Sequence, residues 1–268
     1  MRIAPTGEVR RRLVLIAHTD TNKHRITFRP LLKRLFPAIT TGVLVNMVAG
    51  GLIHLFRTVG PRRSFPTLYR LSLIGLIKSL VLAAADERSG YVDGANDNAS
   101  AVACVLGLAG RLQQQPLKQT EVWLAFTGAE EVGCMGMHEL LDRYGSQLTD
   151  AWFLDLEMVG AGDLVYVTRH TSASYLNGYR PDPHSVALAD KAARRNPEMN
   201  VTGRDVVTME EIGALRKRGY RGICLAGVDH DGWLVNWHQH TDNVNNIEPA
   251  CVERAARFTW EMIQSLDQ

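Results

Sequence analysis

Short apolar runs alternate with longer segments of helical periodicity along most of the chain. Residues 13–17 form an apolar run with β-branched members, which is typical of a strand buried on both faces. Similar runs predict further strands at residues 121–127, 151–156, 163–168 and 221–226. Apolar residues near helical spacing predict helices at residues 99–112, 136–144, 184–195, 210–218 and 248–266. This alternation predicts an α/β sandwich with a largely parallel sheet.

Residues 26–85 interrupt the alternation with two long apolar segments. Residues 38–56 carry no formal charge and come close to the roughly 20 residues that a membrane-spanning helix needs. Residues 68–85 carry Arg70 and Lys78, which share one helical face, as in an interfacial amphipathic helix. The sequence therefore predicts a helical insertion that forms a membrane-contacting hairpin, a soluble lid or an oligomer contact. Lys33 and Arg34 precede the first apolar segment and Arg62 and Arg63 follow it, so the basic residues predict no topology.

Composition and charge exclude some classes of function. The chain has 268 residues, of which 46% are hydrophobic and 22% charged, as in an ordinary globular protein. A net charge of +2 and the lack of an aromatic-basic motif argue against nucleic-acid binding. The four cysteines form no Cys-x-x-Cys pair, so neither a disulfide framework nor a thiolate metal site is predicted. The N-terminus leads directly into the first strand and is not a signal peptide, which leaves a membrane-associated or a cytoplasmic location open.

Polar residues stand at the ends of three predicted strands. His18 ends the first strand, the pair Glu130 and Glu131 follows the second, and Glu157 follows the third. In open α/β sheets the carboxyl edge of the strands is where sites are built. These side chains are therefore expected to meet at one edge of the sheet.

A polar loop at residues 93–100 precedes the helix predicted at 99–112. Short polar side chains crowd into this one turn, around Asp97. Such a loop can hold a carboxylate for a metal ion, or cap the following helix through Asn98 or Ser100. The loop alone leaves both functions open.

Histidines and carboxylates from these segments together suit a metal site. The side chains are His18, Asp20, Asp97, Glu130, Glu131, Asp155 or Glu157, His238, His240 and Asp242. Oxygen ligands with a few imidazoles suit zinc, or manganese or cobalt in the same place. One carboxylate can bridge two ions about 3.5–4 Å apart, an arrangement used for hydrolysis. Asp20 and His18 face the same side of the strand, so Asp20 could orient the imidazole.

The order of these segments resembles the co-catalytic di-zinc exopeptidases, which include bacterial leucyl aminopeptidases, glutamate carboxypeptidase and the glutaminyl cyclases. The matching segments are residues 17–20, 94–100, 125–133, 156–160 and 238–242. The resemblance implies a three-layer sandwich with a central, largely parallel mixed sheet flanked by helices. Residues 1–25 and 86–268 would form the catalytic domain, and residues 26–85 a hydrophobic helical insertion.

The resemblance also implies a set of zinc ligands. Asp97 would bridge two ions, and the remaining ligands would be His18 and Glu157 for one ion and Glu131 and His238 for the other. The family usually has Asp where Glu157 stands, which leaves Asp155 as a weaker alternative. His238 is preferred over His240 because the family places its histidine four residues before an Asp, here Asp242.

Two further roles follow from the resemblance. Glu130 looks like the general base, and Asp20 would orient His18. His18 and Asp97 are 79 positions apart, far more than the family needs, and the insertion of residues 26–85 accounts for the excess. The helix that the family has before its first strand is missing, which indicates a truncated N-terminus or a misassigned start.

The resemblance favours a zinc-dependent exopeptidase, most directly an aminopeptidase that acts on peptide or aminoacyl substrates. One alternative is other metal-dependent amide chemistry on the same fold, such as N-terminal glutamine cyclisation, which generally uses one zinc. The other is an inactive, membrane-linked binding module. Neither the preferred side chain of the substrate nor the oligomeric state can be predicted, because loops with no readable code build such pockets.

Overall fold

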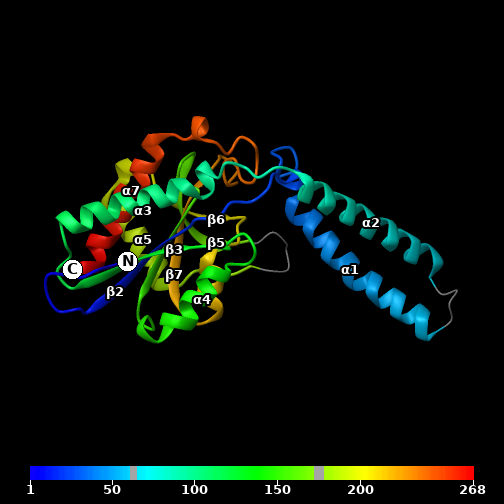
Figure 1. Ribbon diagram of the computed structural model, residues 1–268, viewed down its shortest axis with the longest axis horizontal. Helices are drawn as coiled ribbons and strands as arrows, with labels where there is room; N and C mark the ends of the chain where they lie inside the picture. Colours follow the sequence, from blue (N-terminus) through cyan, green and yellow to red (C-terminus); the bar gives the residue numbers. More distant parts are fainter. Residues whose placement is uncertain (61–64, 172–177) are drawn as a thin grey trace.

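The fold is a seven-stranded sheet with helices on both faces, from which two long helices project (Figure 1). The computed structural model describes residues 1–60, 65–171 and 178–268. The strands are β1 (Arg2–Ile3), β2 (Arg11–His18), β3 (Thr120–Thr127), β4 (Trp152–Glu157), β5 (Asp163–His170), β6 (Thr202–Val206) and β7 (Arg221–Val228). The helices are α1 (Phe36–Val59), α2 (Pro66–Arg88), α3 (Ser100–Gln114), α4 (Met135–Tyr144), α5 (Pro183–Arg195), α6 (Glu211–Lys217) and α7 (Pro249–Asp267).

The sheet is mixed and largely parallel, in the order β1-β3-β2-β4-β7-β5-β6. Parallel pairing joins β3 to β2, β2 to β4, β4 to β7 and β5 to β6. Antiparallel pairing joins β1 to β3 and β5 to β7. The predicted fold class is thereby confirmed, with β2 and β4 at the centre of the sheet, where parallel strands are covered on both faces.

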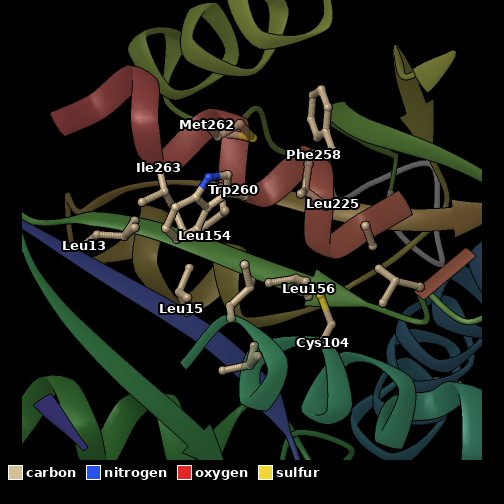
Figure 2. Packing of buried hydrophobic residues seen from close by; sticks show 14 of the residues in the cluster. Leu13, Leu15, Cys104, Leu154, Leu156, Leu225, Phe258, Trp260, Met262 and Ile263 are labelled. Atoms are coloured by element: carbon tan, nitrogen blue, oxygen red, sulfur yellow. The ribbon is translucent and has the colours of Figure 1, made fainter. Parts of the chain in front are cut away.

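Side chains that alternate along the strands divide the core into two layers. On β2, Leu13 and Leu15 face the layer of α3, α5 and α7, whereas Val14 and Ile16 face the layer of α4 and α6. Figure 2 shows the first layer, in which Trp260 and its neighbours on α7 lie against leucines of β2 and β4. The core thus fixes the central strands, and with them the edge at which their carboxyl ends meet.

The predicted strands and core helices are all present, each within about three residues of its expected bounds. The two strands without a predicted counterpart are β1, which has two residues, and β6, whose sequence is Thr-Gly-Arg-Asp-Val. Neither carries an apolar run, because both strands lie at the edges of the sheet. Edge strands bury less side-chain surface, so periodicity does not mark them.

Helices α1 and α2 form an antiparallel hairpin, called here the hairpin, which stands away from the sheet (Figure 1). Both helices are long and apolar enough, by length and composition, to cross a membrane, and only 6% of the apolar stretch of each is buried. The large apolar side chains that the two helices expose are Leu44, Val45, Met47, Val48, Leu52, Leu55, Phe56, Val59, Leu68, Leu71, Leu73, Ile74, Ile77, Leu80 and Val81.

Candidate metal centre

The carboxyl ends of three adjacent parallel strands bring the expected side chains together. His18 is the last residue of β2 and pairs in register with Thr127, the last residue of β3. Glu157 is the last residue of β4, on the other side of β2. The turn after β3 supplies Glu130 and Glu131, so sequence-distant groups share one edge of the sheet, as expected for an α/β site.

His18, Asp97 and Glu157 form one buried group of side chains. The His18 Nε2 atom lies 3.1 Å from Asp97 Oδ1 and 3.6 Å from Glu157 Oε1. One potential ligand atom from each residue lies within 4.8 Å of the others. That spacing is suitable for one ion held by an imidazole and two carboxylates.

Asp97, Glu131 and His238 form a second group of the same kind. The His238 Nε2 atom lies 3.3 Å from Asp97 Oδ2 and 3.0 Å from Glu131 Oε2. Asp97 therefore offers one carboxylate oxygen to each group. A carboxylate in this position can bridge two metal ions.

The side chains of these groups fit a metal better than they fit one another. His18, Asp97, Glu157 and His238 are buried, where a charge that no ion compensates is costly. His18 Nε2 and Asp97 Oδ2 have no hydrogen-bond partner among the described residues. Two imidazoles and three carboxylates are ligands that zinc accepts.

The pKa values show how strongly these charges depend on one another. Burial opposes ionisation of Asp97, but the adjacent imidazoles of His18 and His238 hold its pKa well below the usual range. Burial also disfavours the imidazolium of His238, yet Asp97 and Glu131 raise its pKa to about 9. Burial raises the pKa of Glu157 to about 8, against the opposing effect of His18. Metal ions bound between these side chains would therefore replace the protons that Glu157 and His238 otherwise hold.

Hydrogen bonds hold the Asp97 loop against β4 and a distant carboxylate. The backbone N–H groups of Asn96 and Asp97 donate to the two oxygens of Asp242, at 2.5 and 3.3 Å. The Asn98 side chain donates to Glu157 Oε2 at 3.1 Å and accepts from the Met158 N–H at 2.9 Å. The loop thus positions Asp97 and Glu157 with respect to each other.

The expectation that Asn98 or Ser100 caps the following helix is wrong. Helix α3 has no side-chain cap at its N-terminus. The Asn98 side-chain amide donates to the Leu156 backbone oxygen on β4 at 2.9 Å, and the Ser100 hydroxyl donates to the carbonyl oxygen of Asn96 at 2.8 Å. These polar side chains therefore hold the Asp97 loop in place and do not cap the helix.

Asp20 organises the turn that carries the glutamates. Its two carboxylate oxygens accept hydrogen bonds from the backbone N–H groups of Glu130 and Glu131, each at 3.1 Å. The carboxylate also lies 3.5 Å from His18 Nδ1, which is closer, at 3.1 Å, to the backbone oxygen of Asp20. Ala129, directly before the pair, has a positive φ of 54°, a strained conformation that often occurs at functional sites.

The two alternative ligands lie outside both groups. Asp155 is buried among Glu210, Glu211 and Cys224 on the same face of β4 as Glu157. The His240 ring is stacked on His24, with ring centroids 4.2 Å apart. The geometry therefore favours Glu157 and His238 as ligands.

The sequence pattern gave no sign of Asn22 or of the buried Glu211. Asn22 donates to Glu131 Oε2 at 2.7 Å across 109 positions, so no local spacing could indicate the contact. Glu211 accepts from the Thr127 hydroxyl at the end of β3. Burial and Glu211 together raise the pKa of Glu130 well above its usual range.

A cavity of about 230 Å³ opens over the second group. Asp97, Glu130, Glu131 and His238 form its polar floor, and its other walls include Asn22, Phe28, Thr208, Met209 and Trp237. The volume lies just below the roughly 300–1,000 Å³ of drug-sized ligand sites.

The fold and the grouped ligands suit a metallopeptidase-type hydrolase, and the family of the chain supports that class. The chain belongs to peptidase family M28, whose family model matches residues 78–263. That match includes Asp97, Glu130, Glu131, Glu157 and His238, whereas His18 and Asp20 precede it. A comparison with curated proteins found no match.

Solved structures share the fold at low sequence identity. Glutaminyl cyclase from Porphyromonas gingivalis is 16% identical, with a TM-score of 0.62 over 99% of this chain and 76% of that one. A Zn-dependent exopeptidase from Parabacteroides distasonis is 16% identical, with a TM-score of 0.58 over 98% and 75%. BSAP, a zinc aminopeptidase from Bacillus subtilis, is 20% identical, with a TM-score of 0.54 over 64% and 42%. These relatives share the fold but differ in activity.

Proposed function

We propose that the protein is a zinc-dependent aminopeptidase that hydrolyses the peptide bond after an N-terminal residue. The observation that carries this proposal is the position of Asp97, whose two oxygens face separate groups of ligands. His18 and Glu157 would hold one ion, and Glu131 and His238 the other. A two-ion site favours hydrolysis over glutamine cyclisation, which generally uses one zinc.

Bound zinc would polarise the scissile carbonyl and lower the pKa of water. Glu130 would take a proton from the attacking water through a side-chain oxygen and deliver it to the leaving amine nitrogen. Burial and the nearby Glu211 keep the pKa of Glu130 high, which suits a group that must both accept and release a proton. Asp20 would hold the Glu130–Glu131 turn by its two backbone hydrogen bonds.

We also propose that the chain has two parts. Residues 1–25 and 86–268 would form the catalytic domain, and residues 26–85 an insertion with a separate role. The support for this division is the projection of the hairpin from a sheet whose core it does not enter (Figure 1).

Metal analysis combined with a substrate panel tests the activity. Purified full-length protein is expected to hold about two zinc ions and to release N-terminal residues from aminoacyl chromogenic substrates, with loss of activity in a chelator. The panel includes a peptide with N-terminal glutamine. One zinc per chain and conversion of that peptide to its cyclic form would favour glutaminyl cyclase activity instead.

A third outcome would favour a binding module. If the protein binds no metal after reconstitution with zinc, or if the zinc-loaded protein turns over no substrate in the panel, the catalytic proposal fails. Manganese and cobalt are tested in parallel, because the same ligands accept them.

A further inference from the structure

The hairpin has an inverted distribution of apolar and polar side chains for a protein in water. Its large aliphatic residues point outward, for example Val48 and Val81, which are 66% and 62% exposed. The described side chains of the hairpin and the sheet leave these outer faces uncovered. An exposed apolar surface of this extent marks an interaction site.

The contact between the two helices is made by small and polar residues instead. A Cβ atom at Gly50 would lie 2.2 Å from the Ser72 hydroxyl, and one at Gly75 would lie 2.7 Å from the Asn46 amide nitrogen. The Asn46 side chain donates to the Ser72 backbone oxygen at 3.1 Å. Close approach at glycines with interhelical hydrogen bonds is typical of helices packed within a membrane.

The dimensions of the hairpin match a bilayer. Helix α1 has 24 residues and α2 has 23, which gives each a length of about 35 Å at 1.5 Å per residue. The hydrocarbon core of a bilayer is about 30 Å thick. Lys78 on α2 has an alkyl stem that can run along the helix toward the headgroups.

Charged residues fix the base of the hairpin on the catalytic body. Lys33 Nζ lies 2.7 Å from Asp229 Oδ2 and 2.5 Å from Asp231 Oδ2. The buried Phe36 packs edge-on against Phe28 and Trp233. Charged contacts at the base of the hairpin, followed by two apolar helices, are the arrangement expected where a protein enters a membrane.

We propose that α1 and α2 insert together into a lipid bilayer and hold the catalytic body at its surface. The site lies close to that surface, since Phe28 lines the cavity and the Arg25 N–H donates to the His238 backbone oxygen at 3.0 Å. On the basis of the proposed function, the substrates are then peptides whose N-termini are presented at the membrane. A second copy of the chain is the competing occupant of the apolar surface.

Vesicle flotation of the full-length protein tests the insertion. Protein purified in detergent is reconstituted with vesicles of phosphatidylcholine and phosphatidylglycerol and then washed with alkaline carbonate. The wild-type protein is expected to float with the vesicles. The double variant Val48→Asp/Val81→Asp is expected to float at least about tenfold less, because the short carboxylate side chains meet the hydrocarbon core and, unlike the long side chain of Lys78, cannot extend to the headgroups.

A matched control makes the same change on the catalytic body. Val9 and Val244 are exposed there, and Val9→Asp/Val244→Asp is expected to float like the wild type. Wild-type protein that stays monomeric in water without detergent would overturn the proposal, as would a discrete soluble oligomer that protects the hairpin. Zinc content and peptidase activity are measured in detergent for every variant. If the proposed function is wrong, zinc content or peptidase activity will be missing while the protein still floats with the vesicles. If the membrane proposal is wrong, flotation will be missing while zinc content and activity remain.

Discussion

Asp97 is the residue on which both ligand groups depend, because each of its oxygens faces a different imidazole. Its contacts with two histidines leave it ionised in spite of its burial. The residue beside the cavity that remains available for proton transfer is Glu130. In the proposed mechanism, separate residues would therefore hold the metal and move the proton.

The substitution Glu130→Gln should abolish turnover without removing the metal. The amide keeps the size of the side chain but cannot accept a proton, so kcat is expected to fall by roughly 10²- to 10⁴-fold. Zinc content should remain at the wild-type value. The matched control is Glu139→Gln on α4, whose side chain is exposed and lies away from the cavity. Unchanged kcat in the Glu130 variant would exclude it as the base.

The metal-free protein should lose stability as the pH rises. The folded-state pKa is about 8 for Glu157 and about 9 for His238, above ordinary values of 4.5 and 6.5. Such groups stabilise the fold fully below the ordinary pKa, and that contribution is lost as the pH rises through the folded pKa. Zinc replaces these protons, so the Tm gap between zinc-loaded and metal-free protein should widen from about pH 6 to about pH 9. A gap that stays constant in thermal unfolding would contradict this coupling.

Asn22 is expected to support the metal ligand Glu131. Its amide donates to Glu131 at 2.7 Å, and its oxygen accepts from the Arg25 guanidinium. Loss of such a contact in Asn22→Ala should weaken binding of one zinc ion by roughly 10- to 100-fold, as measured by competition with a chelator. The exposed Asn245→Ala is the control. Equal affinities in the two variants would show that the contact is only structural.

The sequence predicted the side chains at strand ends and the supporting carboxylates Asp20 and Asp242, but not the other side chains that support them. His18 and Glu157 could be predicted because a buried strand fixes where its last side chain points. Asn22, Asn98 and Glu211 act through contacts between segments that are far apart along the chain. Such contacts form only in the folded protein and produce no characteristic residue spacing in the sequence. For the same reason Asn98 was expected as a helix cap.

At the scale of elements, the apolar runs predicted the core strands because burial on both faces requires continuous apolar sequence. The edge strand β6 has no such requirement and was missed. For the hairpin, the sequence predicted two apolar segments but not the residues at which the two helices pack against each other. The packing of Gly50 against Ser72 became apparent only from the structure.

Adjacent glycines of α1 provide a test of that packing. A side chain at Gly50 meets Ser72 on α2, whereas the space beside Gly51 is open. Gly50→Leu should force the helices apart and accelerate amide hydrogen exchange in both, and Gly51→Leu should not. Exchange measured by mass spectrometry in detergent micelles distinguishes the two. Equal protection in the two variants would mean that the close contact does not hold the hairpin together.

At the scale of the whole molecule, the hairpin joins the catalytic body where its chain leaves and returns. The backbone N–H of Ile26 donates to Asp86 Oδ1 at 3.0 Å, so both ends of the insertion meet at one point. Residues 22–36 and 86–92 make the contacts with the body, including those of Asn22 and Phe36. The remainder of the insertion contributes nothing described to the cavity or to the sheet.

Replacement of residues 38–84 by a short Gly-Ser linker should therefore separate membrane binding from catalysis. The base contacts stay in place, so the shortened protein should be soluble without detergent and should hold the same amount of zinc. Its kcat/KM on a small aminoacyl substrate should stay within about threefold of wild type, because the ligands and Glu130 are unchanged. Activity on a peptide anchored to vesicles should fall much further, because the enzyme is no longer held at the surface. If zinc and small-substrate activity are lost from a shortened protein that remains folded by circular dichroism, the hairpin acts on the site itself, as a lid would.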